Sequence, residues 1–228
     1  MKRVTILLLF VSFFVEAQAQ RTIHRRKAFY IGGLEGLTTS QISGDGHKGF
    51  HKYGMTGGLF VTKELSQSLT LQVEAIYKEK GSRYHAPPVS DTAAVHSPYY
   101  ETPTEGYFLK MNYIEFPVLL QYTFGELSRF SGLIVELGSG FGVPVHIEEY
   151  VTVPGYNQRQ YGPTFNYYEI CYNAGLSYYL KSNIGFNLRF SRSANAVRDY
   201  YKGEKATLLS PGQQNTVLSF SVNYRFKL

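Results

Sequence analysis

Several residues and patterns are scarce or missing in this chain of 228 residues. Tryptophan is absent and the one cysteine, Cys171, has no partner, so the chain cannot form an internal disulfide. After residue 20, no apolar run approaches the roughly 20 residues that a membrane-spanning helix needs. These absences exclude a disulfide-stapled scaffold and a helical membrane protein. We interpret Cys171 as a small buried residue.

Motifs that carry catalysis or bind nucleotides are missing too. The sequence contains no H-E-x-x-H, G-x-S-x-G, C-x-x-C or P-loop pattern. Gly44, Gly46 and Gly49 have the spacing of a dinucleotide fingerprint, but no apolar strand precedes them and no helix follows. We therefore interpret this stretch as an outer loop, and we expect neither an enzyme nor a cofactor.

The N-terminus has the layout of an export signal. Lys2 and Arg3 precede an apolar stretch that is too short to span a bilayer, and Ala17-Gln18-Ala19 is a small-x-small cleavage site. We expect cleavage after Ala19, so that residues 1–19 are a signal peptide and residues 20–27 a basic periplasmic tail. Of the net charge of +6, the signal carries +1 and the tail +4. The remainder is nearly neutral, which gives no electrostatic footprint for nucleic acid.

Strict alternation is the strongest pattern that the chain does contain. From Leu218 to Leu228, every second residue is large and apolar. The residues between them, from Ser219 to Lys227, are all polar or charged. Successive side chains of a strand point to opposite faces, and apolar outward with polar inward is typical of outer-membrane barrels. The 20 tyrosines and 16 phenylalanines suit the aromatic girdles of such barrels.

Eight segments are predicted to be strands, with uncertain ends: roughly 28–38, 53–63, 69–83, 107–124, 132–149, 166–180, 184–194 and 216–228. The links after the second, fourth and sixth strands are short. The other links are long and form four predicted outer loops, roughly 39–52, 84–106, 150–165 and 195–215. Short periplasmic turns and long outer loops predict an all-β fold: an eight-stranded antiparallel up-and-down transmembrane β-barrel over residues 28–228.

Two features of the predicted strands need separate treatment. Pro117 cannot donate to a strand ladder, and we expect a bulge there; Pro144 raises the same question. The first two strands are rich in glycine, so the sequence leaves open which of their faces points outward. In the fifth strand, Gly138, Gly140 and Gly142 share the inward face, where they make room for large neighbours or let the strand bend.

Six stretches of the chain resemble one protein family. They are Gly32-Gly33-Leu34 with Ser40 to Gly44, Gly57 to Val61, Leu71 to Glu74 with Lys80-Gly81-Ser82, and, most specifically, Tyr113 to Tyr122. These residues resemble the PorT-like or porin-family outer-membrane barrels of diderm bacteria. The resemblance implies an eight-stranded barrel in the cell outer membrane. It implies little about the task, because one branch of the family assists protein secretion and most members have no assigned activity.

Charged residues on the inward rows are the best-defined constellation. They are Glu74, Glu115, Glu136, Glu169, Arg189 and Arg225, with Lys78 beside them. One interpretation is a structural network of ion pairs, and the other is a gated or proton-conducting path. Since a barrel of eight strands is just wide enough for side chains to fill it, the structural interpretation is favoured.

Five histidines map to the outer end of the predicted barrel: His47, His51, His85, His96 and His146. Imidazole clusters bind zinc, copper or nickel, but the histidines lack a tight ligand spacing, so we predict no metal site.

Taken together, these patterns favour a non-enzymatic outer-membrane barrel that presents its outer loops for binding or supports an envelope or secretion assembly. A narrow passive pore is the alternative, followed by an enzyme with an active site at the rim. We expect a monomer in outer-membrane lipid, whose loops contact an extracellular or envelope protein or a glycan. The second loop carries Pro87-Pro88 and Tyr99-Tyr100, which suit recognition.

Overall fold

The computed structural model describes residues 28–45, 49–85, 106–124, 132–153, 156–159, 165–180, 183–199 and 212–228. Nine strands lie within these ranges: β1 Phe29–Ser43, β2 Lys52–Glu64, β3 Leu69–His85, β4 Gly106–Phe124, β5 Leu133–Val153, β6 Tyr156–Arg159, β7 Glu169–Leu180, β8 Ile184–Ser193 and β9 Gln214–Lys227. The same ranges contain no helix of the length and apolarity that a membrane crossing requires. The predicted signal peptide and basic tail lie outside the described residues.

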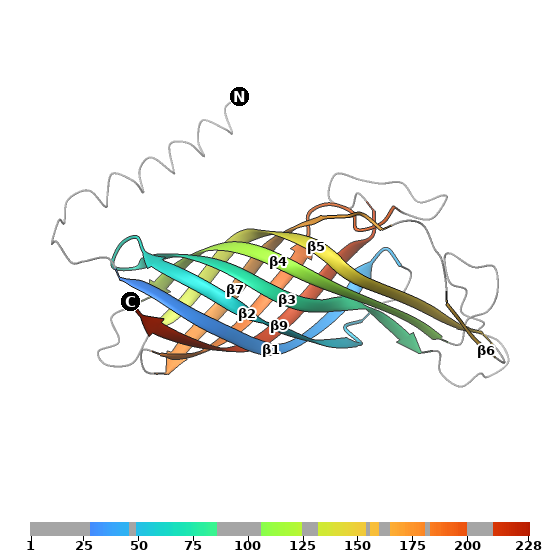
Figure 1. The fold of residues 1–228 in the computed structure, drawn as a ribbon, viewed down its shortest axis with the longest axis horizontal. Helices are drawn as coiled ribbons and strands as arrows, with labels where there is room; N and C mark the ends of the chain where they lie inside the picture. Colours follow the sequence, from blue (N-terminus) through green and yellow to red (C-terminus); the bar gives the residue numbers. More distant parts are fainter. Residues whose placement is uncertain are drawn as a thin grey trace, which may run out of the picture.

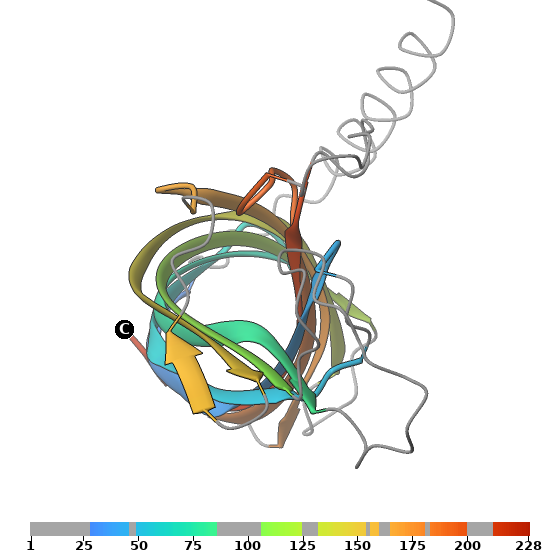
Figure 2. The same cartoon turned by 90° about the vertical axis from the view of Figure 1, so that its right-hand side faces the viewer.

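Eight of the strands close into an antiparallel ring (Figures 1 and 2). Each strand pairs with its neighbours in the order β1, β2, β3, β4, β5, β7, β8, β9, and β9 then pairs with β1 from Tyr30↔Lys227 to Ser43↔Gln214. The short β6 pairs only with the end of β5, so it extends that strand as a hairpin and takes no part in the ring. The predicted all-β, eight-stranded antiparallel barrel is confirmed.

Two of the predicted outer loops are shorter than expected. β1 continues to Ser43 and β2 begins at Lys52, so residues 39–43 belong to the wall. Ser40 and Ile42 are buried on the inward side, which continues the alternation of the strand. Small polar residues on an inward row look like loop residues in a sequence. The predicted loop 150–165 likewise contains the end of β5 and the whole of β6.

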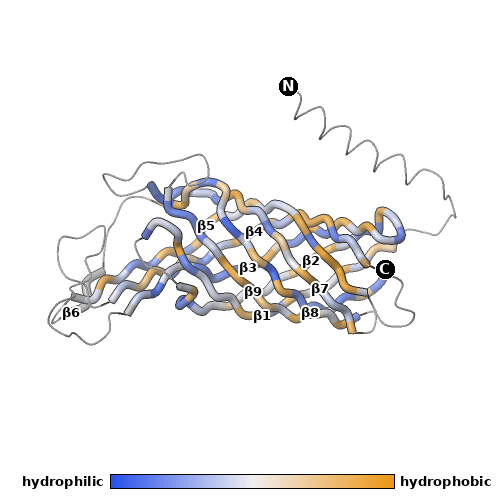
Figure 3. Tube along the Cα trace, turned by 180° about the vertical axis from the view of Figure 1, so that it is seen from behind, coloured by the Kyte–Doolittle hydropathy of each residue, from blue (hydrophilic) through white to orange (hydrophobic). Residues whose placement is uncertain are grey.

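The outward face of the ring is apolar along most of its length, because large apolar residues are exposed on each of its strands. Figure 3 shows hydrophobic and hydrophilic residues following one another along the strands. The two strands whose facing the sequence left open are now resolved: Leu37 of β1 and Met55, Leu59 and Val61 of β2 are exposed on the outside. One outward residue of β1 breaks the pattern. Glu35 is exposed on the same face as Leu37.

The predicted bulge at Pro117 is wrong. Pro117 pairs with Gly140 in a regular register, and on its other side the β3–β4 ladder omits pairs between Val73↔Val118 and Ile76↔Glu115 without shifting. The missing N–H therefore interrupts pairing but adds no residue.

The irregularity lies further along β5, beside the second proline. Asn112 pairs with His146 while Tyr113 pairs with Pro144, so Val145 is the extra residue. An extra residue exchanges the two faces of a strand. Glu136 and Gly142 point inward before it, and Glu149 and Val151 are buried on the inward side after it.

Candidate functional site: a filled lumen and a projecting sheet

The first group of buried charges ties three strands together across the lumen. Arg189 of β8 donates from Nη1 and Nη2 to the two carboxylate oxygens of Glu74, at 2.7 and 2.8 Å, and from Nε to Glu136, at 2.6 Å. Gln121 and Asn187 also donate to Glu136, at 3.2 and 2.9 Å. A bidentate guanidinium–carboxylate pair is among the strongest and most directional of protein contacts, so this group fixes β3, β5 and β8 relative to one another.

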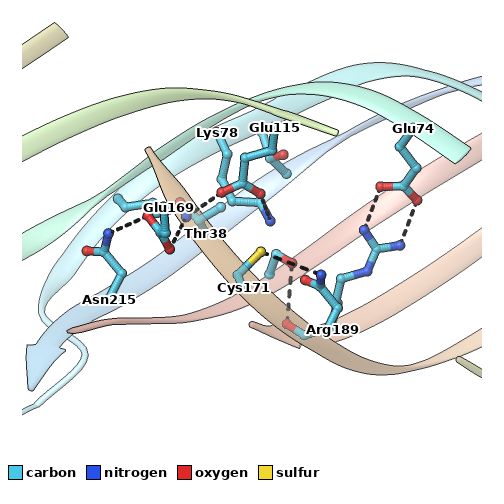
Figure 4. A network of polar contacts seen from close by, with 12 residues as sticks. Thr38, Glu74, Lys78, Glu115, Glu169, Cys171, Arg189 and Asn215 are labelled. Carbon is cyan, nitrogen blue, oxygen red and sulfur yellow. Dashed lines mark hydrogen bonds and ion pairs between the residues drawn. The ribbon is translucent and has the colours of Figure 1, made fainter. Parts of the chain in front are cut away.

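A second group lies next to the first, and Figure 4 shows the two side by side. Glu115 of β4 contacts both Lys78, at 2.8 Å, and Lys80. Lys80 also donates to Glu169 of β7, at 2.9 Å. Glu169 in turn accepts hydrogen bonds from Ser193, at 2.8 Å, and from Asn215, at 2.9 Å. Two lysines thus balance two carboxylates, and all four side chains are buried.

Toward the outer end, the lumen holds an apolar cluster made of Ile42, Tyr107, Leu109, Met111, Tyr113, Val151 and Val197. Val197 comes from the connection between β8 and β9. Its amide donates to the Gln213 carbonyl, and its carbonyl accepts from the Asn166 amide, each at 2.8 Å. This stretch of the connection therefore packs against the inside of the barrel mouth.

A third buried ion pair joins the same connection to β5. The Arg198 guanidinium contacts both carboxylate oxygens of Glu149 at 3.0 Å, and the Tyr107 hydroxyl donates to Glu149 at 2.8 Å. Arg198 also lies over the Phe165 ring, 4.4 Å from its centroid. Buried ion pairs and apolar side chains thus both line the inside of the barrel.

The structure brings five of the predicted lumen residues into two groups: Arg189 with Glu74 and Glu136, and Glu115 with Glu169 through Lys80. Arg225 lies elsewhere, half-buried at the periplasmic end, with its guanidinium over the rings of Tyr179 and Tyr30, at 3.9 and 4.7 Å.

Sequence reasoning missed several buried charged residues, among them Lys80, Glu149 and Arg198. Lys80 follows Lys78 by two positions, so its inward facing could have been read from the same alternation. Glu149 was hidden by the exchange of faces at Val145. Arg198 lies in a predicted outer loop, and no sequence pattern points to its return into the barrel.

Cys171 and the inward glycines of β5 have packing roles. Cys171 is buried, and the Asn173 amide lies 3.6 Å from its sulfur. A Cβ at Gly140 would come within 3.0 Å of that sulfur, and one at Gly142 within 3.2 Å of the Glu115 side chain. The absence of side chains at these two glycines makes room for the residues opposite.

Two of the five outer histidines, His51 and His146, have side chains that the structure describes. No group of three or more His, Cys, Asp or Glu suited to a metal occurs within the described ranges. His146 lies on the outer part of β5, with its Nε2 3.1 Å from Glu148. His47 and His96 lie outside the described residues, as does the side chain of His85. Gly44 and Gly49 have φ values of 90° and 111°, which suits a turn.

β3, β4 and β5 project beyond the rest of the ring at the outer end, and β6 lies at the tip of the projection (Figure 1). They contain 17, 19 and 21 residues, whereas β8 contains 10. On β4, the outward face changes from Val118 and Phe116 to Lys110, whose Nζ is 3.5 Å from Glu79. Both side chains are partly covered, and the Thr38 hydroxyl of β1 donates to the Glu79 carbonyl at 2.8 Å, so the β1–β2 hairpin lies close to this face.

The outward face of this projecting sheet also carries an aromatic pair. The rings of Phe108 on β4 and Tyr150 on β5 lie 6.5 Å apart, tilted by 37°. Lys52 lies over the Phe108 ring, 5.7 Å from its centroid. Both rings are half-buried, and Lys52 is itself buried.

Comparison with known proteins agrees with this architecture. Residues 17–197 match the sequence profile of the family described as outer membrane protein beta-barrel domain. A search among curated proteins finds no match.

Solved structures with a similar fold include Ail of Yersinia pestis, with 13% identity, coverage of 86% of this chain and 98% of that one, and a TM-score of 0.45. OprG of Pseudomonas aeruginosa has 14% identity, coverage of 89% and 97%, and a TM-score of 0.39. Outer membrane protein W of E. coli has 14% identity, coverage of 90% and 100%, and a TM-score of 0.36. Since the family profile matches well over half of the sequence, this chain belongs to the outer membrane protein beta-barrel domain family.

Proposed function

We propose that the protein is a non-enzymatic outer-membrane barrel whose outer end binds an extracellular or envelope protein or a glycan. The filled lumen is the observation that carries the proposal. The inside of the ring is occupied by the apolar cluster and by buried ion pairs, such as Glu74–Arg189 and Glu149–Arg198. The outside of the ring faces lipid. The projecting sheet and the outer loops are the surfaces that remain for recognition.

The projecting sheet has the composition of a binding surface. The Phe108–Tyr150 pair supplies rigid aromatic area, and the Lys110–Glu79 and His146–Glu148 pairs surround it with charge. Aromatic anchors with a polar rim are typical of protein and glycan recognition. A sheet fixed by backbone pairing also loses little conformational freedom when a partner binds.

Further details of the proposal follow from the sequence. The resemblance to PorT-like barrels supports a role in an envelope or secretion assembly. The precursor is exported and cleaved after Ala19, residues 20–27 stay in the periplasm, and the barrel inserts as a monomer. The charged lumen residues act as a structural network that ties opposite strands together. A narrow passive pore is disfavoured by the buried side chains inside the ring.

A photo-crosslinking experiment tests the proposal. A photoreactive amino acid replaces Glu148 on the outward face of the projecting sheet, and in a second variant it replaces Lys63 at the periplasmic end of the wall. Irradiation of intact cells should give discrete protein or glycan adducts at position 148 and none at position 63. The change Phe108→Ala with Tyr150→Ala should remove the adducts. Adducts that persist in this double variant would show that recognition lies elsewhere.

A further inference from the structure

One acidic side chain points into the lipid. Glu35 lies on the outward face of β1, between the exposed residues Ile31 and Leu37 of the same strand. Its direct partners on the neighbouring strands are Gly57 of β2 and Val222 of β9. Because apolar residues flank it along its strand and on β9, Glu35 lies within the apolar belt and not at either boundary.

No cation lies among the neighbours of Glu35 on the two adjacent strands. The exposed side chains around Glu35 on β2 and β9 are Met55, Leu59, Phe220, Val222 and Tyr224, and the only donor among them is the neutral Tyr224 hydroxyl. Among the described outward residues, the nearest cations in the ring order are at the ends of the barrel: Lys63 lies over the Phe29 ring, and Arg192 donates to Gln214. A charge that faces hydrocarbon is costly, and such residues in membrane proteins are usually paired and functional.

Two outward glycines make a notch beside this carboxylate. A Cβ at Gly33 or Gly57 would have its nearest contact at 3.6 Å, which is ordinary van der Waals distance. The inward glycines Gly36 and Gly58 differ, because a Cβ there would collide with the backbone of the next strand. The fold thus requires glycine at the inward positions but not at Gly33 and Gly57.

The side chains around the notch are more exposed than most others on the lipid-facing wall. Leu37, Met55 and Leu59 are exposed by 66%, 61% and 65%, while most other lipid-facing residues are exposed by less than half. Glycine also weakens a strand, since it has no side chain to pack and loses more freedom on folding. A partner that fills the notch explains both observations: the glycines that weaken the strand, and the carboxylate that is exposed to lipid.

We propose that this notch, made of Gly33, Glu35 and Gly57, is a docking site for a membrane-embedded segment of a second protein that brings an arginine or lysine to Glu35. Charge complementarity selects a cationic side chain. Lipid ammonium groups lie at the bilayer boundary, away from Glu35. A second copy of this chain offers no described outward cation in the middle of its apolar belt. The site is in the wall, so the inference does not depend on what the outer end binds.

Photo-crosslinking within the native outer membrane tests the docking site in the full-length protein. A photoreactive amino acid is placed at Met55, beside the notch, and at Leu137 of β5 as a matched control; the two side chains are exposed by 61% and 60%. We expect a discrete protein adduct from position 55 only. Mass spectrometry should identify a membrane-embedded peptide that contains arginine or lysine.

Three variants connect the adduct to Glu35 and the notch. Glu35→Ala should lower the adduct yield about tenfold, because the partner's cation loses its carboxylate. Gly57→Leu should lower it similarly by filling the notch while Glu35 stays in place. Glu35→Lys should abolish it, and a lysine-to-glutamate or arginine-to-glutamate change in the partner should restore it. A shift in gel mobility on heating confirms that each variant is folded and inserted.

The other outcomes overturn the proposal. Adducts with lipid alone would mean that the notch is simply part of the lipid-facing wall. Adducts with a second copy of the chain would indicate self-association. A protein adduct whose yield is the same in Glu35→Ala and in wild type would show that the Glu35 carboxylate takes no part in binding the partner.

Discussion

Arg189 lies between two carboxylates that come from different strands. Its Nη1 is 2.7 Å from Glu74 of β3, and its Nε is 2.6 Å from Glu136 of β5. One guanidinium therefore serves two buried anions inside the ring. Removing the cation leaves both carboxylates facing each other in a site that excludes water, whereas neutralising one carboxylate leaves an intact pair.

This asymmetry predicts unequal effects on stability. Arg189→Ala should lower the free energy of unfolding by roughly 3–5 kcal/mol, the range for a buried ion pair that loses one partner. Glu136→Gln should cost less, since Arg189 keeps its bidentate contact with Glu74. Urea unfolding in lipid vesicles measures both. The exposed Lys63→Ala serves as the control with little change, and a loss for Arg189→Ala no larger than the control would contradict a structural role for the network.

Conductance distinguishes a filled barrel from a pore. We expect no stable ion conductance from the purified protein in planar bilayers, because ion pairs and the apolar cluster fill the ring. Replacing Glu74, Glu136 and Arg189 together by alanine should leave the barrel closed, since the Lys78–Glu115 pair and the apolar cluster remain. A steady open channel in the wild-type protein would favour the passive pore.

Much of the wall could be predicted from the sequence, because strand alternation is a local property. Leu218 to Leu228 of β9 show it without interruption, and each outward residue there was assigned from its neighbours alone. The inward facing of Arg189 followed from the same alternation. In β1 and β2, glycines occupy several of the alternating positions. Because glycine has no side chain, the sequence alone does not show which face of these strands points outward.

The parts that could not be predicted depend on contacts distant in sequence. The sequence indicates that Pro117 lacks a donor, but the partner strand decides whether a residue is inserted, and here the insertion is at Val145. Glu149 changed faces as a result. Arg198 meets Glu149 only because the β8–β9 connection folds back into the mouth, and such a return has no local pattern in the sequence.

A pair of neighbouring glycines tests how closely the strands approach. Gly58→Ala should destabilise the barrel by roughly 1–3 kcal/mol, because the added methyl meets the Ala75 carbonyl of β3. Gly57→Ala should be tolerated, since its nearest neighbour, the Leu34 carbonyl, lies 3.6 Å from the new Cβ. The same urea titration compares the two. Equal losses would mean that strand propensity and not close approach governs this position.

Processing of the N-terminus can be measured directly. We expect the outer-membrane form to begin at Gln20, because Ala17 and Ala19 are the small residues that signal peptidase requires. Ala19→Phe should block the cleavage and leave a precursor that is heavier by the mass of residues 1–19. Intact-mass measurement of the membrane fraction reports both forms. A mature protein that retains Met1 would overturn the assignment of the signal peptide.

The outer end provides the last prediction. β3 and β4 remain paired up to His85↔Gly106, so the ends of the intervening segment are already adjacent and a short glycine linker can replace residues 86–104. Deletions between paired strands are tolerated when the pairing itself is kept. We therefore expect this deletion to leave an inserted, heat-modifiable barrel but to remove the adducts formed at position 148. If binding survives the deletion and is instead lost in Glu115→Ala or Arg189→Ala, the function resides in the lumen and not at the outer end.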